Sequence, residues 1–133
     1  MIEDRIEQVD KAIIAFAEAE KRKEIACKAE FTDLSYIGKI YDICKRSADK
    51  GMRNVWDRRK FVFVILYLYC PTKIFGGRMV EGGLVAVITS ALGLTSAKLV
   101  SKYSMDMKFY YTNYSEFHDD VNRMIEDVLL ELK

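Results

Sequence analysis

Apolar residues recur at helical spacing from the first residues of the chain. Alternating steps of four and three residues separate Ile2, Ile6, Val9, Ile13 and Phe16. This spacing puts the five side chains on one face and predicts an amphipathic helix over residues 2–28. A helix of that length suits a short coiled coil or dimer arm, and it equally suits a helix packed on its own domain.

The next segments repeat the pattern. Thr32 and Asp33 can cap a second helix, because their side-chain oxygens can accept from the free amides of a first turn. Its apolar face consists of Leu34, Ile37, Ile40, Tyr41 and Cys44. The polar stretch 45–54, which contains Gly51, ends this helix.

Residues 56–70 predict a central helix. Phe61 to Tyr69 are apolar all the way round, as in a buried helix. Their β-branched and aromatic side chains leave a buried strand as the competing interpretation. The basic run from Arg58 to Lys60 and the helical context favour a helix, and Pro71 ends it.

After a glycine-containing loop over residues 71–83, two short helices and a last long helix are expected. The first covers residues 84–92 and ends at Gly93. Thr95 can cap the next, which runs to about Tyr111. Ser115 can cap the last helix, whose apolar side consists of Phe117, Val121, Met124, Val128 and Leu132.

Length and composition agree with an all-α fold. The chain has 133 residues, half of them apolar, and a single proline. These values fit one domain with a real core and long helices. We therefore predict a compact bundle of about five to six helices, with residues 1–50 as an N-terminal helical arm and 55–133 as the core.

Cysteine usage and hydropathy bear on the compartment. Cys27, Cys44 and Cys70 are odd in number and widely spaced, so they predict buried thiols in a reducing compartment. The N-terminus lacks the basic stretch of a secretory signal. The longest apolar run, Phe61–Cys70, is shorter than the roughly 20 residues of a membrane span. We expect a cytoplasmic protein without a membrane partner.

The near-neutral total charge of +1 hides a segregation of charges. Residues 1–44 hold seven basic and ten acidic residues, a net charge of −3. Residues 45–108 hold twelve basic and four acidic, net +8, and residues 109–133 hold two basic and six acidic, net −4. A basic middle between acidic ends is what a polyanion-binding face needs, although solvated charges can also cluster by chance.

One segment carries a recognisable motif, VAVITSALGLTSAKLVSKY over residues 85–103. Ile88 and Leu92 supply the core face of a first helix, with Thr89 where two helices cross. Gly93 tolerates the left-handed angles of a turn. Leu94 then fills the space between the two helices at the turn, and Leu99 points back into the core. This segment resembles the helix-turn-helix of bacterial and phage DNA-binding proteins.

The resemblance implies a recognition helix that begins at Thr95 and enters the major groove of double-stranded DNA. Ser96, Ala97 and Ser101 match positions that face base edges, and all three are too small for bidentate readout. Lys98 and Lys102 are the expected contacts to phosphates or bases. Candidate backbone contacts flank the motif at Lys73, Arg78, Arg58 and Arg59. Lys102 stands at a position that is usually apolar in the recognition helix of this family. Either Tyr103 packs into the core in place of that residue, or the helix is rotated relative to the family geometry.

A weaker architectural resemblance connects residues 55–133 with the C-terminal DNA-binding domain of the DnaA replication initiators. An apolar helix precedes the motif, and a further amphipathic helix follows it. The Arg-Asp-His-Thr-Thr signature of that family is absent from this sequence. The resemblance therefore implies the architecture and not origin recognition.

Other chemistry has less support. His118 is the only histidine, so neither a Ser-His-Asp nor a Cys-His arrangement can be drawn, and we expect no enzyme activity, metal or cofactor. The acids beside it suit the first turn of an exposed helix. An aromatic cluster could stack on single-stranded nucleic acid or form a protein interface, with about half of it packed against Trp56 and the central helix: Tyr103, Phe109, Tyr110, Tyr111, Tyr114 and Phe117.

The sequence thus predicts a non-enzymatic DNA-binding protein, such as a phage or mobile-element transcription regulator or a replication accessory, that forms a homodimer through its N-terminal helix. The alternative is a protein-interaction or assembly module in which the motif is structural. Basic side chains that share a face would favour DNA, whereas acids that neutralise them would favour the assembly module.

Overall fold

The computed structural model describes residues 2–26, 28–48, 50–75 and 82–133, and these are all-α. The described ranges hold seven α-helices and two short 3₁₀ helices: α1 (Ile2–Ala26), η1 (Leu34–Tyr36), α2 (Ile37–Ser47), α3 (Val55–Tyr69), η2 (Pro71–Lys73), α4 (Gly82–Ala91), α5 (Ala97–Tyr103), α6 (Met107–Asn113) and α7 (Ser115–Leu132). The predicted fold class is confirmed. There is one helix more than expected because the segment predicted as a single helix from Thr95 to Tyr111 is broken at Asp106, whose φ is 60°.

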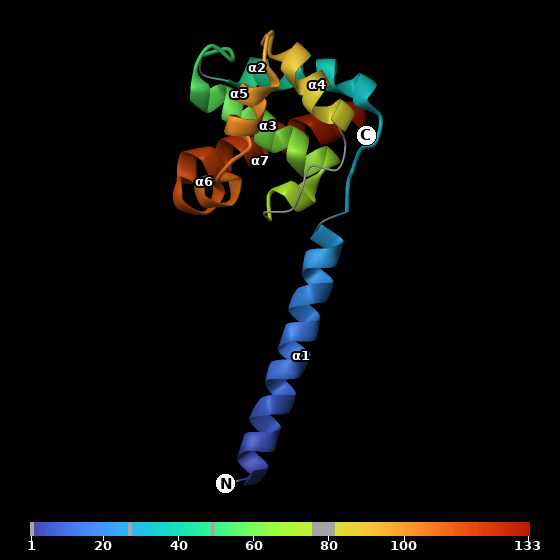
Figure 1. Cartoon of the computed structure of the whole chain (residues 1–133), viewed down its shortest axis with the longest axis vertical. Helices are drawn as coiled ribbons and strands as arrows, with labels where there is room; N and C mark the ends of the chain where they lie inside the picture. The colour runs from blue at the N-terminus through green and yellow to red at the C-terminus, as the bar shows by residue number, and fades with distance from the viewer. Residues whose placement is uncertain (1, 27, 49, 76–81) are drawn as a thin grey trace.

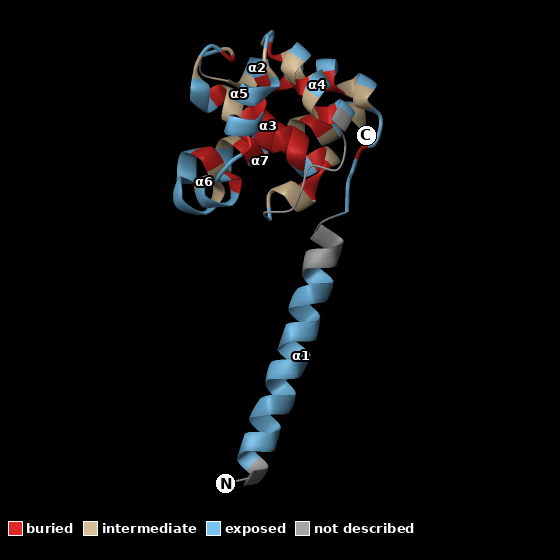
Figure 2. Cartoon of the chain, viewed as in Figure 1, coloured by how far each residue is buried: buried red, intermediate tan, exposed pale blue. Residues whose placement is uncertain are grey.

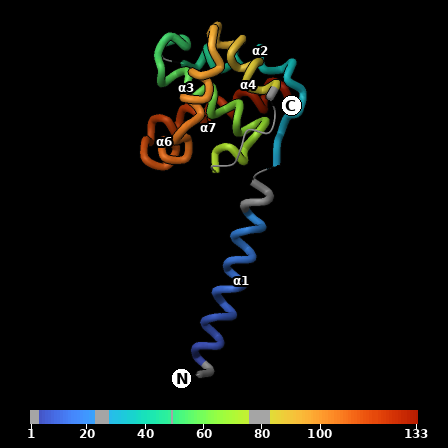
Figure 3. Tube along the Cα trace, in the orientation of Figure 1, coloured from blue at the N-terminus to red at the C-terminus, as the bar shows by residue number. Residues whose placement is uncertain are grey.

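The first helix projects from the rest of the molecule as a single rod (Figures 1 and 3). Every side chain that is described in it, from residue 4 to residue 22, is exposed (Figure 2). The amphipathic helix is therefore confirmed, and these residues do not pack on their own domain.

The remaining helices surround α3, which crosses the middle of the bundle (Figure 1). Phe61 to Leu66 are all buried, and so is Leu68. The apolar run of this helix is thus covered on nearly every side, with Tyr67 at 39% exposure as the exception, and the strand interpretation is wrong. Asn54 caps its first turn by accepting from the Asp57 amide at 2.8 Å, and η2 begins directly after it at Pro71.

Two amphipathic helices, α2 and α7, pack on each other and on α3. The buried face of α7 contains Phe117, Val121, Met124 and Val128, as predicted. Ile37 and Ile40 of α2 are fully buried, so α2 lies in the bundle, whereas the sequence grouped it with the arm.

Of the caps predicted for the second and the last helix, Asp33 is confirmed at the start of the second helical segment and Ser115 is wrong. Asp33 caps η1, where it accepts from the Ser35 amide at 2.9 Å, and α2 follows with no side-chain cap of its own. Ser115 is the first residue of α7, and Tyr114 at the N-cap makes no capping bond.

The chain after α1 is fastened to the C-terminal end of α3. The amides of Glu30 and Phe31 both donate to the Leu68 carbonyl at 2.9 Å. Glu30 also pairs with Lys133 at 2.5 Å. Phe31 is buried, so the bundle proper begins at this residue.

Cys44 and Cys70 are buried, as expected, and Cys27 lies outside the described residues. Burial raises the pKa of Cys44 to about 12, with a further contribution from the negative charge of Asp127. Among the described helices, none is both long and apolar enough to cross a membrane.

Candidate nucleic-acid interface

The α4–α5 pair is joined by a turn whose geometry follows from one glycine. Gly93 has φ +67°, the left-handed conformation that the sequence predicted for it. The Leu94 amide donates to the Thr89 carbonyl and the Gly93 amide donates to the Ser90 carbonyl, both at 3.0 Å. These two bonds make a Schellman motif, which satisfies the last carbonyls of α4 and turns the chain toward α5.

Core side chains fix the α4–α5 pair against the bundle. Ile88 is fully buried and Leu92 is 8% exposed, as the motif requires, and the half-buried Leu94 packs against the same core. The Thr89 hydroxyl donates to the Val85 carbonyl at 2.7 Å. This bond satisfies the Thr89 hydroxyl, which stands at the helix-crossing position where helix-turn-helix proteins more often have alanine.

The register of α5 differs from the one predicted. Ser96, not Thr95, caps the helix, and its Oγ accepts from the Lys98 amide at 3.2 Å. Val100 is fully buried and Tyr103 is 5% exposed, whereas Leu99 is 38% exposed. The prediction that Leu99 points into the core is wrong, and Tyr103 takes the packing position next to Lys102.

This register leaves one face of α5 in solvent. Ala97, Lys98, Ser101 and Lys102 are all exposed, and Thr95 lies just before them, also exposed. Neither Lys98 nor Lys102 forms an ion pair with a described residue. The two ammonium groups lie four residues apart on a helix and so point the same way.

A second set of cations lies beside the turn. A hollow of about 770 Å³ is bounded by Leu92, the last buried residue before Gly93, and by the loop between α2 and α3. We call it the basic hollow, since four of its lining residues are cationic and none of the described ones is acidic: Lys45, Lys50, Arg53 and Arg58. None of these four forms an ion pair within the described part of the chain.

Lys50 and Arg53 lie in the loop between α2 and α3, and hydrogen bonds from the start of α3 hold this loop in place. Gly51 and Met52 have φ of +60° and +70°, and the Met52 side chain is buried. Arg58 Nε donates to the Met52 carbonyl at 3.1 Å, and the buried Asp57 carboxylate accepts from the Lys50 amide at 3.0 Å. Residues 50 and 52 are therefore held against the start of α3 by these hydrogen bonds.

Sequence reasoning missed Lys45, Lys50 and Arg53, because it treated residues 45–54 only as the end of a helix. The signal was the density of cations in a short polar stretch between two apolar segments. The polar stretch 45–54 lies close to the turn at Gly93 because α2 packs on α4.

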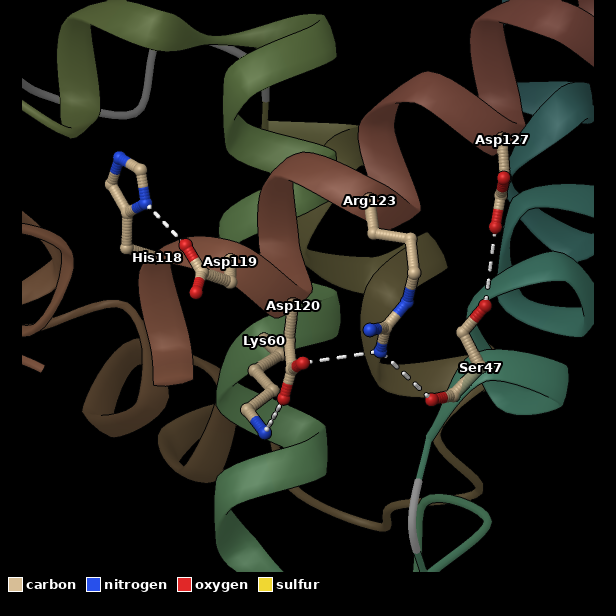
Figure 4. A network of polar contacts seen from close by, with 7 residues as sticks. All are labelled: Ser47, Lys60, His118, Asp119, Asp120, Arg123 and Asp127. Carbon is tan, nitrogen blue, oxygen red and sulfur yellow. Dashed lines mark hydrogen bonds and ion pairs between the residues drawn. The ribbon is translucent and has the colours of Figure 1, made fainter. Parts of the chain in front are cut away.

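Acidic side chains gather along α7, where several of them form ion pairs (Figure 4). Lys60 Nζ lies 2.6 Å from Asp120, and Arg123 lies 3.1 Å from the other oxygen of the same carboxylate. Arg46 is paired with Glu131 at 2.7 Å. The acids of α7 therefore neutralise Lys60, Arg123 and Arg46, not the lysines of α5 or the basic hollow.

Two of the predicted flanking residues, Arg59 and Lys73, do not join this surface. The Arg59 guanidinium lies over the rings of Trp56 and Tyr110, at 5.6 and 5.0 Å. Lys73 lines a separate hollow of about 560 Å³ together with Lys108. Arg78 lies outside the described residues.

The other candidate chemistry is structural in this arrangement. His118 Nδ1 lies 3.0 Å from Asp119, and its ring is 4.5 Å from that of Tyr111. Phe63 of α3 stacks on Tyr111 at 5.2 Å. About half of the aromatic cluster thus packs inward, as expected, while Phe109 is 53% exposed.

Comparisons with known proteins add no assignment. No protein-family model, no curated protein and no solved structure matches this chain.

Proposed function

We propose that the protein is a non-enzymatic binder of double-stranded DNA, which it contacts with the exposed face of α5 and the basic hollow. The observation that carries this proposal is that the lysines of α5 and the cations of the basic hollow form no ion pair with a described residue. Lys98 and Lys102 follow the turn at Gly93 along the chain, and the cations of the hollow line it together with Leu92, the residue just before that turn. Cations that no acid neutralises attract a polyanion such as duplex DNA.

The side chains available favour contacts to phosphates. Lysines bind phosphates as point charges, and the arginines of the hollow can bind them in a bidentate manner. Ala97 and Ser101 are too small for bidentate base readout, and the Ser96 oxygen already caps the helix. We therefore expect weak sequence preference, with affinity dominated by charge.

Two copies paired through α1 would present two such surfaces to one duplex, as helix-turn-helix readers commonly do. This arrangement fits a regulator or a replication accessory, including one encoded by a phage or mobile element. The helix-turn-helix resemblance of residues 85–103 supports this setting.

The second candidate is a protein-interaction or assembly module. It is favoured by the apolar side chains that α6 and the turn before it expose: Met105 at 59%, Phe109 at 53% and, directly after α6, Tyr114 at 46%. Tyrosine and phenylalanine are enriched at protein interfaces. In that case this face would bind a partner and the α4–α5 pair would only support the fold.

Fluorescence anisotropy of a labelled random-sequence duplex at low and moderate salt tests the proposal. The wild type should bind with an affinity that falls as salt rises. Lys98→Ala/Lys102→Ala should lower the affinity and reduce the slope of log K against log salt by about 2, because each phosphate contact contributes roughly 0.9.

Lys73→Ala/Lys108→Ala is the matched control, since it removes the same charge from the separate hollow. It should leave the slope near the wild-type value. Absence of binding, or equal losses in both double variants, would contradict the proposed interface and favour the assembly module. Far-ultraviolet circular dichroism checks that each variant is folded.

A further inference from the structure

The first helix exposes an apolar stripe that nothing in the described chain covers. Ile6, Val9, Ile13 and Phe16 keep 56%, 49%, 61% and 68% of their surface exposed. Their 4-3-4 spacing puts them on one side of the helix. The helix itself projects from the bundle as an exposed rod (Figure 2). Helices in water draw most of their stability from packing an amphipathic face, so a stripe of this kind calls for a partner.

We propose that the partner is the same helix of a second copy of this chain, paired in parallel and in register as a short coiled coil. The 4-3-4 spacing assigns Ile6 and Ile13 to the a positions and Val9 and Phe16 to the d positions of a heptad. Two-stranded parallel coils prefer β-branched residues at a with Leu at d; the a positions here match that preference, while Val9 and Phe16 replace the Leu. This inference rests on the proposed pairing through α1 and specifies its geometry.

The charges beside the stripe determine the orientation. Arg5 occupies a g position and Asp10 the e position of the following heptad, and these are the positions that meet across a parallel dimer. Neither residue has an ion pair with a described residue of its own chain. Two symmetric Arg5–Asp10 pairs can therefore form between the copies.

The ion pairs that α1 makes within itself lie away from this seam. Lys11 pairs with Glu7 at 3.3 Å, and Arg22 lies 3.9 Å from Glu18. These four residues fall on the b, c and f positions, which face solvent in a two-stranded coil. The helix thus satisfies its outer charges internally and leaves Arg5 and Asp10 beside the apolar seam.

The opposite orientation is less favourable on two counts. An antiparallel pair that overlaps the stripe brings e positions together, so that Asp10 faces Asp10 of the second copy and the like charges repel. It also places the two bundles at opposite ends of a 25-residue helix, about 38 Å long. A parallel pair holds both bundles at the same end, where both basic surfaces can reach one duplex.

Oxidative cross-linking without DNA tests this geometry, in a Cys27→Ser background that removes the native thiol nearest the helix. Ile13→Cys should form a covalent dimer, because a positions face their own copies in a parallel register. Lys11→Cys, two residues away on the outer face with a side chain 75% exposed, is the matched control and should not. Equal cross-linking of both variants, or of neither, would overturn the proposal.

Analytical ultracentrifugation provides the second test. The wild type should sediment as a dimer, Arg5→Glu should weaken the dimer roughly tenfold, and Arg5→Glu/Asp10→Arg should restore it. A monomeric wild type, or a double variant no stronger than the single one, would overturn the parallel pairing. DNA binding by the bundle is measured separately, so a failed dimer and a failed DNA interface are distinguishable.

Discussion

The ion pair between Lys60 and Asp120 is expected to contribute strongly to the stability of the bundle. It joins the central helix α3 to α7 with an N–O distance of 2.6 Å, and Lys60 is only 6% exposed (Figure 4). Asp120→Asn keeps the shape of the side chain but removes its charge. The Lys60 ammonium then stays buried without its counter-ion.

The magnitude follows from that burial. Removal of one partner of a buried pair costs about 3–5 kcal/mol, because the remaining charge is desolvated and uncompensated. Lys60 also lines a hollow of about 540 Å³, which is wide enough for water to solvate part of the ammonium. We therefore expect the lower end, about 3 kcal/mol. For a bundle of this size that corresponds to a fall in Tm of roughly 12 °C or more.

Urea unfolding followed by circular dichroism measures the free energy of unfolding directly. Asp119→Asn is the matched control, because Asp119 is the neighbouring residue, its side chain is 75% exposed, and its loss should cost under about 0.5 kcal/mol. Lys60→Met added to Asp120→Asn should recover stability by removing the stranded charge. A cost for Asp120→Asn as small as that of the control, or no recovery, would refute the reasoning.

Three further predictions concern local geometry and ionisation. Gly93→Ala should lower the free energy of unfolding in urea by about 1–2 kcal/mol, because φ is +67° there. Gly38→Ala has open space around the new methyl group and should not destabilise the protein. Equal costs for the two variants would contradict this. Val100→Ala should cost about 2 kcal/mol and Leu99→Ala under about 0.5, and the reverse order would mean that α5 is rotated. Burial raises the pKa of Cys44 from 9.0 to about 12, so the thiol of the unfolded chain ionises first as pH rises. The free energy of unfolding should therefore fall above about pH 9, by up to about 1.4 kcal/mol per pH unit. Unfolding of Cys44→Ala from pH 8 to pH 10 should lack this part of the slope, and an unchanged slope would contradict the assignment.

Elements with long periodic patterns could be predicted from the sequence. The apolar side of α7 extends over 18 residues, so its period fits only a helix. The apolar run of α3 also allowed a strand, and the basic run before it and the helical context favoured the helix. Gly93 was equally predictable, because the left-handed turn depends on the absence of a Cβ at that one residue. The pattern from Ile6 to Phe16 likewise predicted the apolar stripe of α1.

The face of a short helix was harder to predict. α5 has seven residues, about two turns, and such a length fits two phases of the helical period almost equally well. The motif favoured Leu99 inward, whereas packing against α3 buries Val100 instead. Ser96 rather than Thr95 caps the helix for the same reason, since the start of α5 is set by its contacts.

The sequence by itself determined the helices, the turn at Gly93 and the concentration of cations between residues 45 and 108, because each depends on neighbours along the chain. Only the tertiary structure decided which cations have acidic partners. Lys60 and Arg46 meet carboxylates of α7 from far along the chain, while the side chains of Arg53 and Lys98 form no ion pair with a described residue. Charge pairing depends on distance in space, and the packing of α2, α4 and α7 sets those distances.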